Sequence, residues 1–280
     1  MAICFDKQIT NRTAKAIGVP TPHEVFLTAG PGLLDRLNDP GSFESRRIRD
    51  ELNFPLFVKP AQGDNSYGIF TSNIIDTWGQ LVQVVGDLIY KFQVRDLCVQ
   101  EYLSGKEYGI GMIGNPECGA VTFLPILEVD FSRIEDRQLP TILGYESKWD
   151  PESPYWNEIS YVRAKSLTRD QELLLQSYAL KLFTRFGCRD YARFDFRADA
   201  KGTIKLLEVN PNPGWCWDGK LNHMASHLGL DYPTLLKAII AAGEKRLYND
   251  SNSSSGGKII AEPIMSSSSS SLSSSSTTSR

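Results

Sequence analysis

Two short alternating stretches late in the chain constrain the fold most. Tyr191–Arg197 and Thr203–Asn210 each alternate apolar with polar residues, and a short polar turn that ends in Gly202 separates them. Alternation with a period of two is typical of strands with one buried face, and so short a connection joins antiparallel neighbours. The sequence therefore predicts an antiparallel hairpin over residues 191–210.

The polar face of this hairpin carries carboxylates and an amide. If the register brings the polar faces together, Asp195, Glu208 and Asn210 converge beside Arg193. Oxygen-only ligands suit Mg²⁺ or Mn²⁺ better than zinc, and Mg²⁺ commonly adds substrate phosphates to its ligands. The pattern is consistent with a nucleotide–metal site, and equally with a solvated strand face that holds incidental salt bridges.

A helix is predicted directly before the hairpin. Thr168 followed by Gln171 is a capping-box pattern, and apolar residues then recur at helical spacing until Gly187. Turn signals alternate with short β-rich runs and further helical stretches elsewhere, with no internal repeat. These features indicate a mixed α and β fold.

Composition and charge exclude several classes of protein. The 33 acidic residues exceed the 30 basic ones by only three, which argues against a general nucleic-acid binder. No apolar run approaches the roughly 18 residues of a membrane span, and residues 1–30 contain no signal-peptide block. The five scattered cysteines form no CxxC pair, which argues against a disulfide framework or structural zinc. We expect a soluble, cytoplasmic protein.

Two apparent motifs near the hairpin are discounted. His223 and His227 have helical spacing, but Met224 stands where a zincin-type motif requires Glu, so a solvated helix face is favoured over a metal site. Residues 214–220 spell GxxxxGK, yet Leu221 replaces the Ser or Thr that would hold Mg²⁺ in a phosphate-binding loop.

Two upstream segments are candidates for nucleotide contacts. Phe54–Val58 is an apolar strand run that leads into Lys59 and then a glycine-bracketed polar loop over residues 63–68, an arrangement that can clamp phosphate. Glu101 and Glu107 flank a second turn and could accept hydrogen bonds from an adenine amino group and ribose hydroxyls. Surface charge is the commoner role of such glutamate pairs.

Taken in order, these segments resemble the ATP-grasp superfamily and, within it, the D-alanine–D-alanine ligase branch. The likeness spans about Asp6 to Leu247, and the motifs follow the family order: DK with GVPTP, FVKP with its loop, LPILEV, YESKW, RFD and EVNPNPG. The resemblance implies an α+β fold of two lobes, each with a mostly antiparallel sheet, that hold ATP between them. We assign the lid lobe with its N-terminal segment to 1–105 and the lobe with the metal and catalytic site to 106–249.

The resemblance also implies roles for the matching residues. The expected nucleotide contacts are phosphate-binding lysines, a lid serine, and glutamates for adenine and ribose: Lys7, Lys59, Lys148, Ser66, Glu101 and Glu107. The expected metal ligands, for two Mg²⁺ or Mn²⁺ ions, are Asp195, Glu208 and Asn210. Arg193 is expected to stabilise the oxyanion, with Lys148 beside it.

The sequence departs from the family pattern in the lid and before the first motif. Before the DK motif the family carries a further N-terminal α/β domain, whereas here only Met1 to Phe5 precede Asp6. We therefore expect a truncated chain, a degenerate protein, or one that receives this domain from a partner or a second copy. Asp64 and Asn65 replace small lid residues, and a carboxylate near a triphosphate is repulsive unless it turns away or meets a metal.

Further departures concern the substrates. Gly219 and Lys220 stand where the family has the Ser-Leu pair that holds the second substrate's carboxylate. The Gly219 N–H and the Lys220 charge could still bind a carboxylate, but specificity for D-alanine does not carry over. Arg163 replaces the usual proline, with no effect that the sequence explains.

The leading hypothesis is an ATP- and Mg²⁺-dependent ligase that joins a small, amino-acid-like carboxylate and an amine through an acyl phosphate. One alternative is a nucleotide-binding protein of the same fold that no longer ligates and is regulatory or awaits a partner subunit. Another is peptide or tripeptide ligation, which would change only the substrate residues. The serine-rich residues 250–280 cannot bury enough apolar surface to fold, so we predict a disordered tail, regulatory or dispensable.

Overall fold

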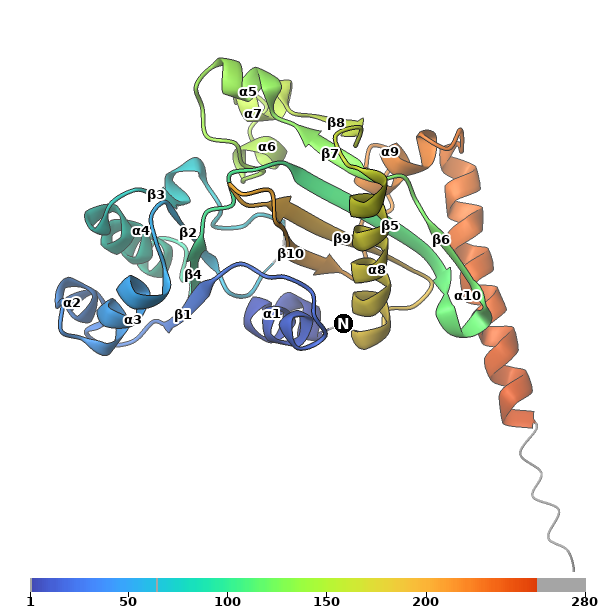
Figure 1. Ribbon diagram of the computed structural model, residues 1–280, viewed down its shortest axis with the longest axis horizontal. Coiled ribbons are helices and arrows are strands. Elements are labelled where there is room, and N and C mark those ends of the chain that lie inside the picture. The colour runs from blue at the N-terminus through green and yellow to red at the C-terminus, as the bar shows by residue number, and fades with distance from the viewer. Residues whose placement is uncertain (1, 64, 256–280) are drawn as a thin grey trace, which may run out of the picture.

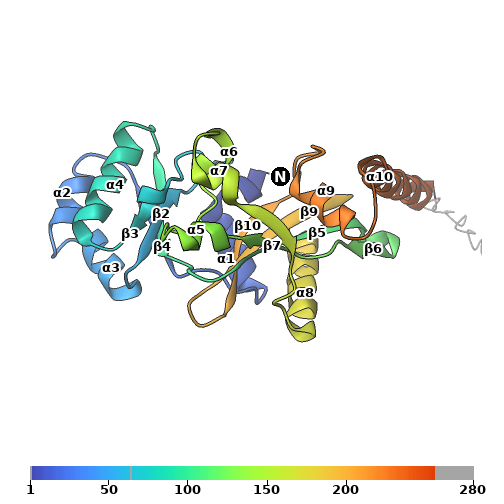
Figure 2. The same cartoon turned by 90° about the horizontal axis from the view of Figure 1, so that it is seen from above.

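Each half of the molecule is built on an antiparallel sheet (Figures 1 and 2). The computed structural model describes residues 2–63 and 65–255. Within them, the first sheet contains four strands in the order β1-β4-β2-β3. The second contains six, in the order β10-β9-β5-β7-β8 with β6 paired to β5. Every strand pairing in the two sheets is antiparallel, which confirms the predicted α+β architecture of two lobes.

Helices α2, α3 and α4 pack on the first sheet, at the end of the molecule remote from the second sheet (Figure 1). The strands of this lobe are β1 (Glu24–Thr28), β2 (Leu56–Pro60), β3 (Ile74–Ile75) and β4 (Asp96–Glu101). Its helices are α2 (Leu33–Asn38), α3 (Phe43–Glu51) and α4 (Trp78–Tyr90), with the 3₁₀ turn η2 (Thr71–Asn73). Thr77 and Gln80 form a capping box at the start of α4, whose Leu81, Val85 and Leu88 are buried in the core of the lobe. Burial of each such side chain contributes about 1.5–3 kcal/mol.

The second sheet is covered by helices on both faces (Figure 2). Its strands are β5 (Glu107–Asn115), β6 (Ala120–Phe123), β7 (Leu127–Asp130), β8 (Ser160–Arg163), β9 (Tyr191–Ala198) and β10 (Ile204–Asn210). The helices and turns are η1 (Ala2–Phe5), α1 (Lys7–Ala16), η3 (Pro116–Cys118), α5 (Ser132–Asp136), α6 (Glu146–Trp149), α7 (Pro154–Glu158), α8 (Arg169–Arg185), α9 (Lys220–Ser226) and α10 (Tyr232–Ser255). Residues of α1 and α8 share one core cluster with the sheet, and residues of α9 and α10 share another. The predicted capping box of Thr168 and Gln171 starts α8.

The predicted hairpin is confirmed as β9 and β10, with one feature that simple alternation misses. Leu206 lies opposite Phe196, but the register then shifts so that Glu208 lies opposite Asp195 and Asn210 opposite Arg193. Strict alternation would place Glu208 on the same face as Leu206, in the core beneath α8. The bulge therefore turns Glu208 and Asn210 onto the polar face of the sheet.

The N-terminal segment packs on the second lobe, not on the first as the predicted division at residue 105 had it. Cys4, Ala14 and Val19 are buried in the core cluster that contains α8, and the Leu206 N–H donates to the Pro20 carbonyl at 2.8 Å. The physical reason is that the apolar side of α1 finds its partners on β9 and β10, while β1 starts the first sheet only at Glu24.

Helix α10 continues to Ser255, past the tail boundary predicted at residue 249. Arg246 accounts for part of this extension because it pairs with Asp190 at 2.9 Å and with Asp250, one helical turn later, at 3.7 Å. The rest of the predicted tail, 256–280, lies outside the described residues. Among the helices that the structure describes, none is long and apolar enough to cross a membrane.

Candidate nucleotide and metal site

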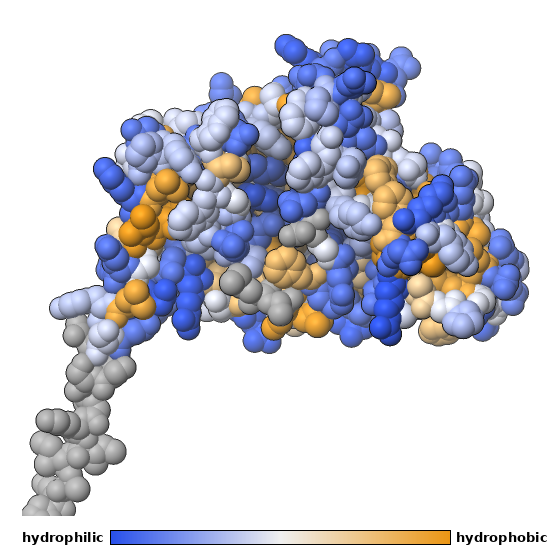
Figure 3. All heavy atoms as spheres, turned by 180° about the vertical axis from the view of Figure 1, so that it is seen from behind, coloured by the Kyte–Doolittle hydropathy of each residue, from blue (hydrophilic) through white to orange (hydrophobic). Residues whose placement is uncertain are grey.

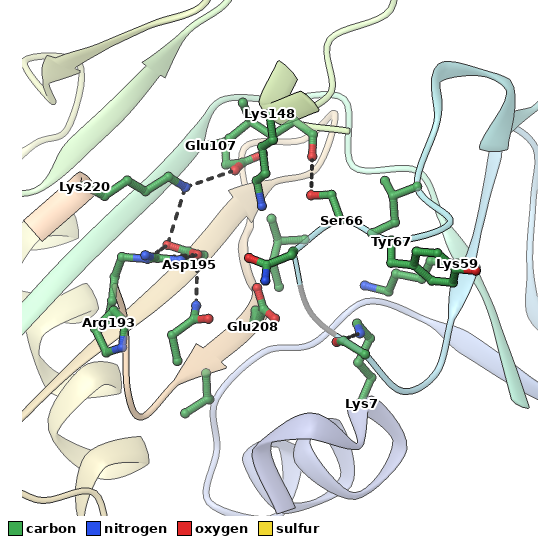
Figure 4. Close-up of a pocket in the computed structure, with 18 of the residues that line it drawn as sticks. Lys7, Lys59, Ser66, Tyr67, Glu107, Lys148, Arg193, Asp195, Glu208 and Lys220 are labelled. Carbon is green, nitrogen blue, oxygen red and sulfur yellow. Dashed lines mark hydrogen bonds and ion pairs between the residues drawn. The ribbon is translucent and has the colours of Figure 1, made fainter. Parts of the chain in front are cut away.

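A cavity of about 710 Å³ lies between the two sheets and is lined from both lobes (Figure 4). On the face opposite to that of Figure 1, hydrophilic side chains gather around the hollow between the lobes (Figure 3). The lining includes most of the predicted site residues: Lys7, Lys59, Ser66, Glu107, Lys148, Arg193, Asp195, Glu208, Asn210, Gly219 and Lys220. The fold thus brings together side chains that are far apart in the sequence.

Besides Lys220, three lysines enter the cavity from three separate elements. Lys7 begins α1, which is capped by the Asp6 carboxylate, and the Lys7 N–H donates to Ala61 at the end of β2 at 2.9 Å. Lys59 is a buried residue of β2, and Lys148 lies on α6. Burial and then the nearby Lys220 lower the pKa of Lys148, against the opposing charges of the site's carboxylates. These cations give the cavity the charge that a polyphosphate requires.

Two loops, one from each lobe, form the roof of the cavity. The Ser66 hydroxyl donates to the Leu143 carbonyl at 3.3 Å, and the Trp149 indole N–H donates to the Asn65 carbonyl at 3.2 Å. The Tyr145 N–H also donates to the Ile69 carbonyl at 2.7 Å. Ser66 therefore lies in a loop over the cavity, here called the lid, and this lid is tied to residues 143–149, the segment that carries Lys148. Asp64, the predicted lid carboxylate, lies outside the described residues.

Arg193 and Asp195 form an ion pair with two short hydrogen bonds in the site (Figure 4). The Arg193 Nε and Nη2 atoms each donate to one Asp195 oxygen at 2.9 Å, and the Asn210 amide donates to Asp195 Oδ2 at 3.1 Å. Residues two apart on a strand share a face, which is why the pair forms within β9. Burial raises the pKa of Asp195, but Arg193 and Lys220 outweigh it and lower that pKa to about 2. Asp195 is therefore a carboxylate throughout the neutral range.

The donor set beside Asp195 fits one oxygen-ligated divalent ion. Glu208 lies directly opposite Asp195, and Asn210, two residues further along β10, lies on the same face. Two carboxylates and an amide therefore line the same part of the cavity. The described residues contain no group of three or more His, Cys, Asp or Glu side chains that could hold a metal. Such a site, with few protein ligands and all of them oxygen, is typical of Mg²⁺ that completes its shell with water and phosphate.

Lys220 lies at the inner end of the cavity between two carboxylates. Its Nζ atom is 3.8 Å from Asp195 Oδ1 and 3.9 Å from Glu107 Oε1, and it lies 5.5 Å from the centre of the Tyr161 ring. Burial raises the pKa of Glu107, and Lys220 and Arg197 oppose this rise. The Lys220 ammonium is therefore engaged by the protein's own anions.

Residues 15–241 match the family model described as "D-ala D-ala ligase C-terminus". The chain belongs to this family. The curated relatives include the uncharacterized protein y4sG of Sinorhizobium fredii, 29% identical over 246 residues, 88% of this chain and 64% of the relative. They also include the D-alanine–D-alanine ligase of Aquifex aeolicus, 27% identical over 242 residues, 85% of this chain and 69% of the relative.

Solved structures of D-Ala ligases have the same fold. The VanG D-Ala:D-Ser ligase from Enterococcus faecalis has a TM-score of 0.65 at 21% identity, over 86% of this chain and 62% of that protein. The D-alanine–D-alanine ligase from Coxiella burnetii has a TM-score of 0.66 at 19% identity, over 92% and 62%. The chain spans about two thirds of the length of the relatives and structures that it matches.

One residue expected to contact the nucleotide, Glu101, lies outside the cavity. Glu101 does not line the cavity, because its Oε1 accepts from the His23 N–H at 2.8 Å and from Lys205 at 2.6 Å. Side chains alternate along β4, so Gln100 and Tyr102 face the cavity and Glu101 faces away. Gln100, which is 2% exposed, is the polar residue that the sequence analysis missed, and the alternation of this strand could have identified it.

Gly219 and Lys220, which stand in place of the family's Ser-Leu pair, were expected to bind a substrate carboxylate, and the structure shows other partners for both. The Gly219 N–H donates to the Cys216 carbonyl at 3.0 Å within a tight turn, so it is not offered to a substrate carboxylate. Lys220 is engaged by Glu107 and Asp195. Both residues line the cavity, but the Gly219 N–H is already used within the turn, and the Lys220 charge is partly offset by two carboxylates.

Proposed function

We propose that the protein is an ATP- and Mg²⁺-dependent carboxylate–amine ligase that acts on small, amino-acid-like substrates. The observation that carries this proposal is the single cavity in which lysines from both lobes face the Arg193–Asp195 pair and Glu208. The proposal is further supported by membership of the D-Ala–D-Ala ligase family and by relatives whose names include D-Ala and D-Ser ligases.

The proposed reaction has two steps. The substrate carboxylate attacks the γ-phosphorus of ATP, which releases ADP and forms an acyl phosphate. The amine then attacks the acyl carbon, and the amide forms as inorganic phosphate leaves and the amine loses a proton. Lys7, Lys59 and Lys148 bind and orient the phosphates, and their charges offset the negative charge of the transferring group.

Arg193 has a donor left for the second step. Its Nε and Nη2 atoms are committed to Asp195, whereas Nη1 makes no hydrogen bond within the part of the chain that the structure describes. That N–H group can donate to the oxyanion that develops on the acyl carbon, and Asp195 holds the guanidinium plane in position for it. Asp195, Glu208 and Asn210 would hold the Mg²⁺ ion, which when bound neutralises phosphate charge.

The deciding experiment incubates the protein with Mg²⁺-ATP and a pool of amino acids, dipeptides and hydroxy acids. ADP release and new masses are followed by mass spectrometry. A new mass equal to two pool members minus water, formed with ADP, supports the ligase. Arg193→Ala should lower turnover by about 10²–10³-fold with a far smaller change in ATP affinity. Arg189→Ala, at an exposed arginine outside the cavity, is the matched control and should behave as wild type.

A second candidate is a nucleotide-binding protein of the same fold that does not ligate. The observation in its favour is that the Gly219 N–H donates to Cys216 and the Lys220 charge is shared with Glu107 and Asp195, which weakens the expected contact with a substrate carboxylate. ATP that binds with Mg²⁺ but is never consumed with any pool member would support this candidate and reject the ligase.

A further inference from the structure

The fixed position of Lys220 is the starting point for a second, narrower proposal. Lys220 is the first residue of α9, and this helix lies unusually close to β5 because Gly111 has no side chain. A Cβ atom at Gly111 would be 2.9 Å from both Leu221 Cδ2 and Met224 Sδ. Leu221 and Met224 are buried in the core cluster between α9 and the sheet. The start of α9, and with it the Lys220 ammonium, is therefore held by packing.

The charges around Lys220 divide the sheet carboxylates of the cavity into two kinds. Asp195 is paired with Arg193 and Lys220, and Glu107 is paired with Arg197 and Lys220. Glu208, by contrast, has no ion pair among the described residues, although it lies directly opposite Asp195. The protein thus places its own cations in close ion pairs with Glu107 and Asp195, whereas the positive charges nearest to Glu208 act on it from beyond 4 Å.

A cation bound between Asp195 and Glu107 would meet Lys220 in the same place. The ammonium already lies within 4 Å of one oxygen of each carboxylate. Asp195 and Glu107 are buried and the Lys220 side chain is only 15% exposed, so the repulsion between the ammonium and a divalent ion would be screened less than in water. Among the described residues no cation lies within 4 Å of Glu208, and the charges of Lys148 and Arg193 act on it only from farther away.

We propose that the Lys220 ammonium takes the place of one divalent ion between Asp195 and Glu107, so that the nucleotide-bound protein holds a single divalent ion, bound by Glu208, Asn210 and the side of Asp195 that faces them. This inference rests on the proposed binding of Mg²⁺-ATP, and it replaces the two ions expected from the sequence. Lys220 is in this view a positioning residue that fixes where metal charge is placed in the cavity.

The test counts metal ions per bound nucleotide. Protein is dialysed against saturating Mn²⁺ and the non-hydrolysable analogue AMP-PNP, and the bound excess of each is measured, Mn²⁺ by electron paramagnetic resonance and nucleotide by absorbance. Wild type should bind one Mn²⁺ per AMP-PNP. Lys220→Met, which removes the charge but keeps an apolar side chain of similar length, should bind two.

Lys205→Met is the matched control. Lys205 is also largely buried between two carboxylates, at 2.6 Å from Glu101 and 3.1 Å from Asp199, but it does not line the cavity. This variant should bind one Mn²⁺ per AMP-PNP, like wild type. Lys220→Arg, which keeps the charge, should also bind one.

Each other outcome rejects the inference, and the outcomes separate it from the proposed function. Two Mn²⁺ ions per nucleotide in wild type would show that Lys220 excludes no ion, while the proposed nucleotide site would stand. One ion per nucleotide in both wild type and a folded Lys220→Met variant would also show that Lys220 excludes no ion. Absence of AMP-PNP binding in wild type would reject the proposed function and the inference with it. If Lys220→Met does not fold, the wild-type and Lys220→Arg counts still decide, because two ions in either contradict the proposal.

Discussion

Gly109 lies directly opposite Asp195 on the neighbouring strand, and a Cβ atom at Gly109 would be 3.3 Å from Asp195 Oδ1. The same Cβ would be 3.1 Å from the Met224 methyl group. A glycine at this position of β5 therefore gives the carboxylate room to lie between Arg193 and Lys220. Gly109 has no side chain that could bind a metal, yet it determines where the proposed ligand Asp195 can lie.

We predict that Gly109→Ala displaces the Asp195 carboxylate and weakens Mn²⁺ binding in the presence of AMP-PNP by roughly 10- to 100-fold, the usual effect of disturbing a ligand's support. Gly79→Ala is the control, because a Cβ atom at Gly79 in α4 meets nothing within 4 Å. It should leave Mn²⁺ affinity unchanged and raise the free energy of unfolding by up to about 1 kcal/mol. Equal Mn²⁺ affinities in the two variants would mean that Gly109 does not position Asp195.

The hairpin shows how far the sequence could be interpreted. Alternation and a short polar turn predict β9 and β10, and the family motif predicts that Asp195 and Glu208 converge. What alternation alone does not predict is the bulge after Leu206, without which Glu208 would be buried on the face opposite Asp195. A bulge depends on the packing of a whole sheet, and no local residue pattern here specifies it.

The unexpected partners of Glu101 and Lys220 have a different cause. Both residues stand at motif positions, and both charged side chains are taken by partners distant in the sequence, such as Lys205 for Glu101 and Glu107 for Lys220. The strand predicted over Phe54–Val58 is likewise displaced to Leu56–Pro60. Position in a motif predicts which element a residue occupies, but its partners are set by the tertiary fold.

The corrected adenine-side contact gives a second prediction. Gln100 lines the cavity and Glu101 does not, so Gln100→Leu should weaken AMP-PNP binding by roughly 10-fold, because a hydrogen bond with a net value near 1 kcal/mol is lost and its partner is left unpaired. Glu101→Gln should leave the dissociation constant nearly unchanged. Isothermal titration calorimetry of both variants tests this, and a larger loss for Glu101→Gln than for Gln100→Leu would restore the original expectation.

The pair formed by Asp190 and Arg246 predicts a pH dependence of stability. Two hydrogen bonds of 2.9 Å from Arg246, on α10, lower the pKa of Asp190 at the start of β9, against the opposing effect of burial. Because the pKa in the folded state is below the unfolded value, the pair stabilises the fold above about pH 4 and loses that effect as pH falls through the lowered pKa.

At pH 7, Asp190→Asn should therefore reduce the free energy of unfolding by about 1.5–3 kcal/mol, and this difference from wild type should shrink steadily below pH 4. Urea denaturation at several pH values measures it. The exposed pair of Arg169 and Glu172 is the control, since Glu172→Gln should change stability by less than about 1 kcal/mol. If the loss of unfolding free energy in Asp190→Asn stayed constant with pH, the ionised Asp190–Arg246 pair would not be its source.

The roof of the cavity gives the last prediction, on the rate of nucleotide release. Trp149 Nε1 donates to the Asn65 carbonyl at 3.2 Å, a hydrogen bond between the loop that carries Lys148 and the lid that carries Ser66. Trp149→Phe keeps an aromatic ring and removes the donor. A hydrogen bond of this kind has a net value of about 0.5–1.5 kcal/mol, so release of a fluorescent ATP analogue should become roughly 2- to 10-fold faster.

Trp156 on α7 is the matched control for this change. It is also partly exposed, and no hydrogen bond from its indole N–H is found within the described ranges 2–63 and 65–255, so Trp156→Phe should release the analogue at the wild-type rate. Stopped-flow measurements after mixing with excess unlabelled ATP give both rates directly. Release that is equally fast in Trp149→Phe and wild type would mean that the two loops do not limit escape of the nucleotide. The barrier would then lie in the lysine contacts below them, since Lys59 and Lys148 reach the cavity from opposite lobes and would have to separate from the phosphates before the nucleotide could leave.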